Sequence, residues 1–539
     1  MFKNTAGEGV RIDMSRRSFL TGVAGVGAIA ALGGLAGCAP SQEKADTSNA
    51  KADAASGPKT YDKVDKTYDT DLLIVGGGGS GLACAVQAAL NKTNFILIEK
   101  GSELGGNASF VEGMFAIESK MAEEQGIHVT PSEIIEAELE RGQHRQNGAL
   151  WMDLCTKSAE NIEWCLEQGV MYSGVIDEYN GGLYPTFHWF KDGKCKIGYV
   201  DPMIKRVDEL GIEVHLNTAA TSLIQQDGAI VGAYAEGDDG VVQYNCKAVV
   251  FATGGFGGNP ELIKQQGWDI ENLFVVGSSN AAGDAYRMAL EVGAKDFMND
   301  SAQSILYNIP ALPPIDFHKD ALNPVNGYFG IAAGGPVLWV NEDGDRYTRE
   351  NLTDDNLVLQ CIPGKGNLAN YAVFDQGIFD TFFGTTDDGR AMFEDAVAGD
   401  KTETLFKADS IKGLADACGL DADALAKTVE RYNELAKKGN DDDFGKPAEK
   451  MVAIENGPFY LAKLGYSFFF EVGGIATDKQ RRVLDVDSKP IPGLYAIGND
   501  GNMLYRHVYT INMPGTAFGN QVNSCLLYTS PSPRDRSLS

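Results

Sequence analysis

The stretch TDLLIVGGGGSGLACAVQAAL (Thr70–Leu90) decides the fold of this chain. Its segment Asp71–Val75, apolar after the first residue, predicts a buried strand, and Gly76, Gly78 and Gly81 follow with the spacing G-x-G-x-x-G before an Ala-rich helix. Glycines at this spacing allow a tight turn and let backbone N–H groups approach a pyrophosphate at the helix N-terminus. The stretch therefore predicts a dinucleotide-binding βα unit.

A second predicted strand supports this interpretation. NFILIEK (Asn94–Lys100) carries Glu99 near its end, where a carboxylate accepts the hydroxyls of an adenosine ribose. An acid at this place argues against a 2′-phosphate, so NADP is not expected here. One glycine-rich segment alone could be only a turn or a close helix–strand contact. Strand, glycines, helix, strand and acid in this order favour the cofactor site.

Later segments extend the pattern over most of the chain. GSELGGNASFVEGMFA (Gly101–Ala116), KAVVFATGGFGGN (Lys247–Asn259) and PIPGLYAIGND (Pro490–Asp500) resemble, in order, the cofactor segments of the FAD-binding type 2 superfamily of fumarate reductases, flavocytochromes c and ketosteroid dehydrogenases. The resemblance implies FAD as the cofactor. The positions that it assigns to FAD binding are Gly76, Gly78, Ser80, Gly81, Glu99, Lys100, Gly105, Gly106, Asn107, Ala108, Gly113, Ala220, Thr253, Gly254, Gly255, Asp284, Asn499, Ala517 and Phe518.

The resemblance also implies the architecture. An α/β FAD-binding domain, Rossmann-like and of the glutathione reductase type, is expected over residues 68–298 and 465–524, with an inserted α+β substrate-capping domain over residues 299–464. Within the cap, Glu403–Gly439 has helical apolar spacing and predicts two helices joined at Gly419, with Asp421 capping the second. Gly334–Glu350 predicts a hairpin with an Asp-Gly turn.

Composition and charge narrow the function classes. The chain has 539 residues, is 43% hydrophobic and carries a formal charge of −28. These values fit a soluble globular protein, and the charge argues against nucleic-acid binding, which needs a basic face. The nine cysteines form no C-x-x-C pair, so the sequence shows neither a zinc ribbon nor a c-type haem site, and no metal is expected.

The N-terminal segment resembles an export signal. Twin arginines in SRRSFL (Ser15–Leu20) precede an apolar run of signal length, and LAGC (Leu35–Cys38) resembles a lipobox. We expect residues 1–38 to be a Tat signal with a lipobox and Cys38 to carry a lipid. The protein would then be a lipoprotein on the outer face of the cell membrane, held by the lipid alone. The alternative is an ordinary signal peptide with a chance Cys. Residues 39–67 are polar and predict a disordered tether.

The C-terminal end looks foreign to the fold. Residues 525–539, CLLYTSPSPRDRSLS, resemble translated adapter read-through, and we expect this tail to be non-native.

The substrate half departs from fumarate-type relatives. Those relatives clamp a dicarboxylate with Arg and His and use an Arg as proton donor; the matching positions here are Asp354, Phe470 and Asn512. A dicarboxylate buried without cationic partners would cost several kcal/mol. YSFFFEVGG (Tyr466–Gly474), with Tyr307, Tyr328 and Phe329, favours an apolar or aromatic small-molecule acceptor, although any of these rings could be core. Arg349 lies close enough in sequence to replace the missing donor.

A loop near the C-terminus holds the other catalytic candidates. Ketosteroid dehydrogenases carry a carbonyl-binding Tyr ten residues after the Asn of their GN pair, and this spacing leads from Asn499 to Tyr509. Polarising a carbonyl promotes hydride addition to the conjugated carbon. Arg506 and His507 are further candidates for proton supply. Pro514-Gly515 opens a helix whose first N–H groups would face the flavin.

Three functions remain open on the sequence alone. We favour an exported FAD-dependent oxidoreductase that reduces an activated C=C bond of a small organic acceptor by hydride from flavin N5. The chain shows no haem or flavin-carrier domain, so a separate membrane, cytochrome or quinol-linked donor would supply electrons. The alternatives are a ketosteroid-type dehydrogenase working in the oxidative direction and a catalytically silent electron-relay lipoprotein.

Overall fold

The central element of the computed structural model is a six-stranded sheet of order β19-β20-β11-β2-β3-β7. The structure describes residues 57–179, 182–312, 332, 334–351, 360–399 and 403–529. In the central sheet all neighbouring strands run parallel except β19, which pairs antiparallel with β20. The bounds are β2 (Leu72–Val75), β3 (Phe95–Ile98), β7 (Val214–His215), β11 (Ala248–Phe251), β19 (Arg482–Leu484) and β20 (Pro490–Ala496).

A buried four-residue core strand and the helix after it form the predicted βα unit. All four residues of β2 are buried, as a strand covered on both faces requires. Helix α2 (Gly79–Leu90) follows directly, and β3 pairs with β2 in parallel register from Leu72↔Phe95 to Val75↔Ile98. The predicted strand–glycine–helix–strand order is therefore confirmed.

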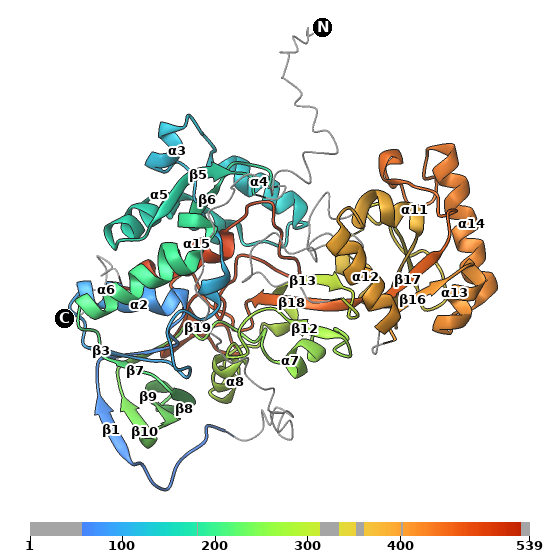
Figure 1. The fold of residues 1–539 in the computed structure, drawn as a ribbon. Helices are drawn as coiled ribbons and strands as arrows, with labels where there is room; N and C mark the ends of the chain where they lie inside the picture. Colours follow the sequence, from blue (N-terminus) through green and yellow to red (C-terminus); the bar gives the residue numbers. More distant parts are fainter. Residues whose placement is uncertain are drawn as a thin grey trace.

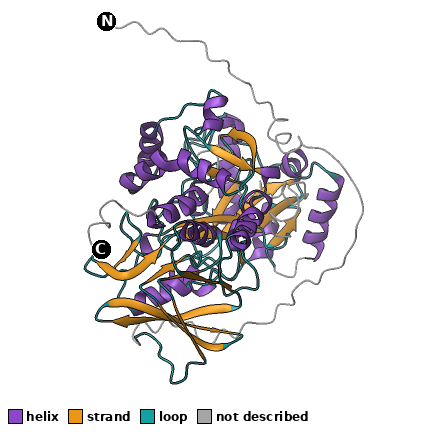
Figure 2. Ribbon diagram, turned by 90° about the vertical axis from the view of Figure 1, so that its left-hand side faces the viewer, coloured by secondary structure: helices purple, strands orange, loops and turns teal. Residues whose placement is uncertain are grey.

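Four smaller sheets surround the central one. A four-stranded sheet of order β1-β10-β9-β8 lies at the bottom of Figure 1, and Figure 2 shows its long strands crossing below the helices. The others have the orders β4-β6-β5, β12-β18-β13 and β14-β15-β17-β16. Their bounds are β1 (Lys66–Asp69), β4 (Gly113–Phe115), β5 (Tyr172–Asp177), β6 (Phe187–Phe190), β8 (Thr218–Gln226), β9 (Ala229–Gly237), β10 (Gly240–Asn245), β12 (Leu273–Val275), β13 (Ala302–Asn308), β14 (Leu338–Asn341), β15 (Asn370–Asp375), β16 (Leu405–Ala408), β17 (Phe459–Lys463) and β18 (Gly465–Val472).

The helices divide between the two ends of the molecule. One group gathers around the central sheet and above it, and the other forms the right-hand lobe of Figure 1. The first group is α2, α3 (Lys120–Glu124), α4 (Pro131–Arg141), α5 (Gly148–Glu167), α6 (Asp201–Glu209), α7 (Pro260–Gln265), α8 (Asp284–Glu291) and α15 (Thr516–Thr529). The second is α11 (Gln376–Ile378), α12 (Asp387–Gly399), α13 (Ile411–Cys418) and α14 (Ala422–Lys438).

The right-hand lobe has its own hydrophobic core. Trp339, Phe374 and Leu461 are fully buried there and belong to a cluster separate from the one that covers the central sheet. The lobe joins the rest of the molecule through β13 and β18, which pair antiparallel. Tyr307 and Tyr466 lie within this core with their rings stacked at 5.5 Å. The interpretation of Tyr307 as a substrate-facing ring is therefore wrong, because it is 1% exposed.

The predicted pair of helices in the lobe is confirmed, whereas the predicted hairpin is confirmed only in its turn. Gly419 ends α13 in a left-handed conformation (φ 82°), and the side chain of Asp421 accepts hydrogen bonds from Asp423 N and Ala424 N at the start of α14. The expected tight turn after β14 also forms, with Gly344 N donating to Asn341 O. The main partner of β14, however, is the distant strand β15 rather than the segment after the turn.

Helix α15 continues past Ser524, where the foreign tail was expected to begin. Cys525 is buried, and its Sγ lies 3.0 Å from Ser80 O. Residues 1–38 and most of the predicted tether lie outside the described residues. Within the described ranges, no helix combines the length and hydrophobicity that spanning a membrane requires.

Candidate active site

The first glycine-rich turn leaves no room for a side chain at Gly76 or Gly81. A Cβ atom on Gly76, where φ is 106°, would lie 2.4 Å from Ala252 O, and one on Gly81 would lie 1.8 Å from Gly76 O. Gly78 is the N-cap of α2 and offers no side-chain cap, and around it the nearest atom to an added Cβ is 3.8 Å away. The first N–H groups of α2 are thus open to an external anion such as a pyrophosphate.

The predicted ribose-binding acid lies at the same end of the sheet. Glu99 follows β3, and its two oxygens accept hydrogen bonds from Gly77 N and Gly101 N, both at 2.7 Å. These contacts fix the carboxylate beside the glycine turn. Each oxygen keeps a second lone pair for a ribose hydroxyl.

The second predicted segment closes over this turn. Gly105 pairs with Gly78 and donates its N–H to Gly77 O at 2.9 Å, and it adopts φ 120°. Nearby, the Asn107 side chain accepts a hydrogen bond from Ser278 N, and Lys100 Nζ pairs with Asp284 Oδ2 at 2.7 Å. Of the remaining predicted contacts here, Gly106 (φ 49°) and Ala108 lie in the short helix after Gly105, Gly113 begins β4, and Ala220 is a buried residue of β8.

The predicted ATGG turn rests on two buried carboxylates. Asp500 accepts hydrogen bonds from Thr253 N at 2.6 Å and from Gly255 N at 2.9 Å, and Glu471 accepts one from Phe256 N. Burial raises the pKa of Glu471 to about 8 and that of Asp500 to about 6. Gly255 has to be glycine, because a Cβ there would lie 1.7 Å from Glu471 Oε1. Gly254 (φ 86°) completes the turn.

The start of α15 meets the glycine turn of α2. Phe518 is buried with its ring edge-on to Tyr199 at 4.9 Å, and an added Cβ on Gly79 would lie 3.0 Å from the Phe518 ring. Gln521 Nε2 donates to Asn499 Oδ1 at 3.4 Å. Ser80 lies beside Gly498, which follows β20. The residues predicted to bind FAD thus gather where β2, β3, β11 and β20 end and α2 and α15 begin.

Aromatic rings line the loop that holds Tyr505 and Tyr509 and leads into α15. Phe470 of β18 is half-buried and packs edge-on against Tyr509 at 5.2 Å. Tyr509 also contacts the ring of Tyr505 at 4.8 Å, and Tyr505 contacts Trp151 of α5 at 5.4 Å. Burial raises the pKa of Tyr509, and the backbone N–H of Ala517 partly offsets this effect. Tyr509 and the start of α15 are therefore neighbours, as the loop prediction requires.

Helix α4 brings two charged residues to this loop. Glu138 is buried and accepts a hydrogen bond from the Thr510 hydroxyl; burial raises its pKa to about 8. Arg141, the last residue of α4, donates from Nη1 to Asn512 Oδ1 at 3.2 Å. Asn512 is 1% exposed. Neither α4 residue stands out in the sequence, where only their i, i+3 spacing could have marked them as one face.

The other catalytic candidates have different surroundings. Arg506 and His507 are exposed: the guanidinium of Arg506 lies 5.4 Å from the Phe297 ring centre, and His507 Nε2 lies 3.2 Å from Asp300 Oδ1. Arg349 is part-buried just before Glu350, whose carboxylate lies in a buried ionic cluster with Arg346. Asp354, Tyr328 and Phe329 lie outside the described residues.

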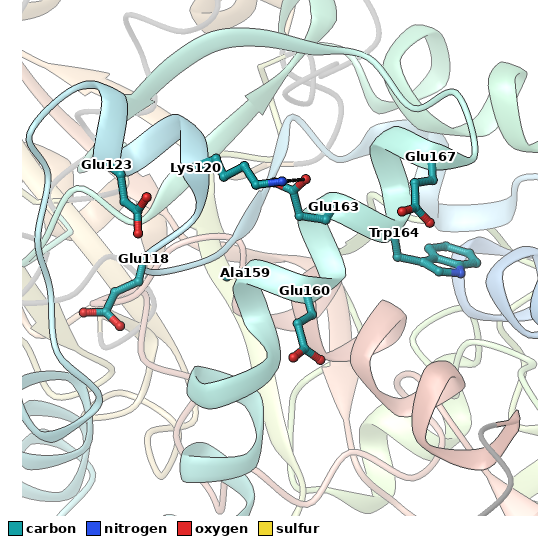
Figure 3. Close-up of a pocket in the computed structure, with 8 residues that line it drawn as sticks. All are labelled: Glu118, Lys120, Glu123, Ala159, Glu160, Glu163, Trp164 and Glu167. Atoms are coloured by element: carbon teal, nitrogen blue, oxygen red, sulfur yellow. Dashed lines mark hydrogen bonds and ion pairs between the residues drawn. The ribbon is translucent and has the colours of Figure 1, made fainter.

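A separate pocket on the surface is lined mainly by glutamate side chains. Glu160, Glu163 and Glu167 of α5 face Glu118 and Glu123, with Lys120 paired to Glu163 at 2.7 Å (Figure 3). Its surplus of carboxylates disfavours an anionic cofactor. It contains none of the residues predicted for catalysis or FAD binding.

The comparisons with known proteins agree with this geometry. The family model described as "FAD binding domain" matches residues 71–512. The chain belongs to this FAD-binding family. It is 31% identical to the vinyl phenol reductase of Lactiplantibacillus plantarum over 83% of this chain and 93% of the relative. It is 29% identical to the urocanate reductase of Eggerthella lenta over 80% of this chain and 70% of the relative.

A solved structure of the family shows the same architecture. The open conformation of a flavocytochrome c3 fumarate reductase matches with a TM-score of 0.62 and 25% identity, over 86% of this chain and 78% of the other. The predicted α/β fold with an FAD-binding domain is confirmed. The protein is an FAD-dependent oxidoreductase of a family whose reductases and dehydrogenases act on CH–CH bonds.

The residues present fit FAD. The uncapped start of α2 and the glycines that tolerate no Cβ form a cradle for a pyrophosphate, with Glu99 on the ribose side. The first N–H groups of α15 carry partial positive charge and would stabilise negative charge on a flavin ring beside them. Two buried acids under the ATGG turn, Glu471 and Asp500, were missed in the sequence. The lone Glu in the apolar run YSFFFEV could have revealed the first of them.

Proposed function

We propose that this enzyme reduces the activated C=C bond of a small aromatic acceptor and does not act on a simple dicarboxylate. The observation that supports this most is the pair Phe470–Tyr509, two rings 5.2 Å apart beside the start of α15. Phe470 occupies a position at which the resemblance to fumarate reductases expects a carboxylate-binding His. An aromatic wall favours a ring-bearing acceptor over a doubly charged one.

The residues of the chain have separable tasks in this reaction. FAD, held by the glycine turn and Glu99, would supply a hydride to the carbon β to the activating group, and a proton taken up at the neighbouring carbon would complete the reduction. Tyr509, with a raised pKa, stays protonated at neutral pH and donates a hydrogen bond to the polarised end of the acceptor. The rings of Phe470 and Tyr505 orient the acceptor and exclude water. The relative from L. plantarum, named for an aromatic vinyl acceptor, gives this proposal further support.

Reoxidation of the reduced protein tests the proposal. FAD-loaded protein is reduced under anaerobic conditions and mixed with 4-vinylphenol, an aryl acrylate, a cyclic enone, a 4-ene-3-ketosteroid or fumarate, and flavin absorbance is followed. We expect the aromatic acceptors to reoxidise the flavin fastest. Fumarate as the best acceptor, or no reoxidation by any aromatic compound, would refute it.

A steroid substrate is the second candidate. The spacing from Asn499 to Tyr509 matches the carbonyl-binding Tyr of ketosteroid dehydrogenases. Flavin bleaching by a saturated 3-ketosteroid, in the presence of an artificial acceptor, would support the oxidative direction. Absence of bleaching in active FAD-loaded protein would remove this candidate.

The proposal includes export and an external electron donor. The twin arginines Arg16 and Arg17 and the lipobox Cys38 suggest Tat export, lipidation and location on the outer face of the membrane. A cytochrome or a quinol-linked protein in the membrane would then reduce the flavin. Labelling with a fatty acid tests this: wild type should take up label and Cys38→Ala should not. Equal labelling of both proteins would exclude the lipid anchor.

A further inference from the structure

Arg481 is a buried cation in an unusual backbone conformation. It lies in the turn before β19, is 0% exposed and adopts φ 63°, a region that residues other than glycine rarely occupy. Its Nη2 donates to Asn520 Oδ1 of α15 at 3.1 Å, and within the described residues its Nε and Nη1 have no hydrogen-bond partner. Burial lowers the pKa of Arg481, yet a guanidinium keeps its proton at neutral pH. The residue therefore places a full positive charge inside the protein.

The acids nearest to this guanidinium are already paired with other cations. Asp153 of α5 forms an ion pair with Lys157 at 2.6 Å, and Asp478 forms one with Arg482 at 2.6 Å. Both acids attract Arg481 electrostatically, but in the part of the chain that the structure describes neither forms an ion pair of 4.0 Å or less with it. A buried charge without a counter-ion is strongly destabilising. Arg481 is thus a positive charge that the protein itself does not neutralise.

Arg481 also joins two segments that carry predicted FAD contacts. Its carbonyl oxygen accepts a hydrogen bond of 3.0 Å from Ala496 N at the end of β20, three residues before Asn499. Its partner Asn520 follows Phe518 by two residues in α15, which is about 3 Å along the helix axis. These two links place the guanidinium at the cofactor end of the central sheet.

We propose that Arg481 is the buried counter-charge of bound FAD, and that its field strengthens cofactor binding and favours the reduced flavin. FAD brings two phosphate charges to the cradle. Two electrons and one proton then convert the neutral oxidised ring into a singly negative reduced ring, so a nearby cation attracts the reduced form more strongly. Salt screens a buried charge much less than an exposed one, so this attraction reaches beyond direct contact. The inference concerns the cofactor alone and holds whichever acceptor is reduced.

Three substitutions in the Arg481–Asn520 pair separate charge from shape. Arg481→Met removes the charge and keeps most of the length, and Arg481→Lys keeps the charge. Asn520→Asp leaves the guanidinium in place and gives it a counter-ion where an uncharged oxygen now lies 3.1 Å from Nη2. The control is Arg431→Met, which removes one positive charge from an exposed arginine of α14 in the right-hand lobe.

Two measurements on the flavin report the charge. The Kd of FAD is obtained by titrating each apoprotein with FAD and following the quenching of flavin fluorescence. The midpoint potential of the FAD-loaded protein is obtained by anaerobic titration with dithionite, which supplies the electrons, in the presence of a reference dye. Neither measurement requires an acceptor.

The expected shifts follow the charge. One unit charge at about 10 Å, with an effective dielectric constant of about 20, changes an equilibrium about 10-fold. Arg481→Met and Asn520→Asp should each raise the Kd of oxidised FAD about 10-fold. They should weaken binding of the reduced form about 10-fold more, which lowers the midpoint potential by about 30 mV. Arg481→Lys and Arg431→Met should stay within about 2-fold of wild type, or about 9 mV.

The same potentials can overturn the assignment. A midpoint potential shared by wild type, Arg481→Met and Asn520→Asp would refute it. Equal losses in Arg481→Met and Arg481→Lys would also refute it, because they would show that shape and not charge matters. If Arg481→Met does not fold, Asn520→Asp, which has the shape of the wild-type residue, still decides. Failure of every acceptor to reoxidise the flavin would count against the proposed function and leave these measurements unchanged.

Discussion

Replacing Glu138 with Gln tests whether this acid is neutral in the folded protein. Burial raises its pKa from 4.5 to about 8, so between these values the native state holds a proton that the unfolded state releases. The contribution of Glu138 to the unfolding free energy is therefore fully present below about pH 4.5 and is lost as the pH rises through about 8. The slope is about 1.4 kcal/mol per pH unit, or about 5 kcal/mol across the whole window.

The glutamine variant lacks this titration but keeps the shape and can still accept the Thr510 hydroxyl. Equilibrium urea unfolding of both FAD-loaded proteins at pH 5.5, 6.5, 7.5 and 8.5 gives the difference in unfolding free energy. The unfolding free energy of the variant, relative to that of wild type, should rise by about 1.4 kcal/mol per pH unit up to pH 7.5. Glu471 and Asp500 titrate alike in both proteins, so the difference isolates Glu138. A difference that stays constant with pH would refute the reasoning.

Three further substitutions and one control probe the site. Tyr509→Phe should retain FAD, by its absorbance, and lower kcat about 10- to 100-fold because a hydrogen bond to the acceptor is lost; unchanged kcat would place the phenol outside the reaction. Gly81→Ala should abolish FAD binding, because its Cβ would lie 1.8 Å from Gly76 O, and full flavin loading would contradict the cradle. Gly255→Ala should lower the melting temperature and flavin content through its clash with Glu471, whereas Gly366→Ala, with no atom within 4 Å of its Cβ, should leave both unchanged. Equal behaviour of the last two variants would be evidence against the clash.

The cofactor half was predictable because its signals are local. Gly76, Gly78 and Gly81 are needed for close backbone approach within one turn, and the strand before them is buried on both faces. Gly419 and Asp421 likewise mark a helix end and a helix start through their own backbone preferences. Each of these features depends on neighbours in sequence.

The substrate half was less predictable because its partners are distant. An aligned motif shows that Asn512 is not an arginine, but only the packed α4 shows that Arg141 reaches it. The aromatic residues of YSFFFEV are divided between two environments: Tyr466 lies in the lobe core, while Phe470 faces Tyr509. The sequence cannot show which ring packs in the core and which faces the site, because the same residue types serve both.

The strand pair β13–β18 belongs to two cores at once. Ile305 and Phe468 pack in the right-hand lobe, while Ala302 and Val472 pack with the Tyr509 cluster. The strand pair therefore links the two cores, so a rotation of the lobe would also turn the strand that holds Phe470. For this reason, substitutions inside the lobe core should change which acceptors fit without contacting any of them.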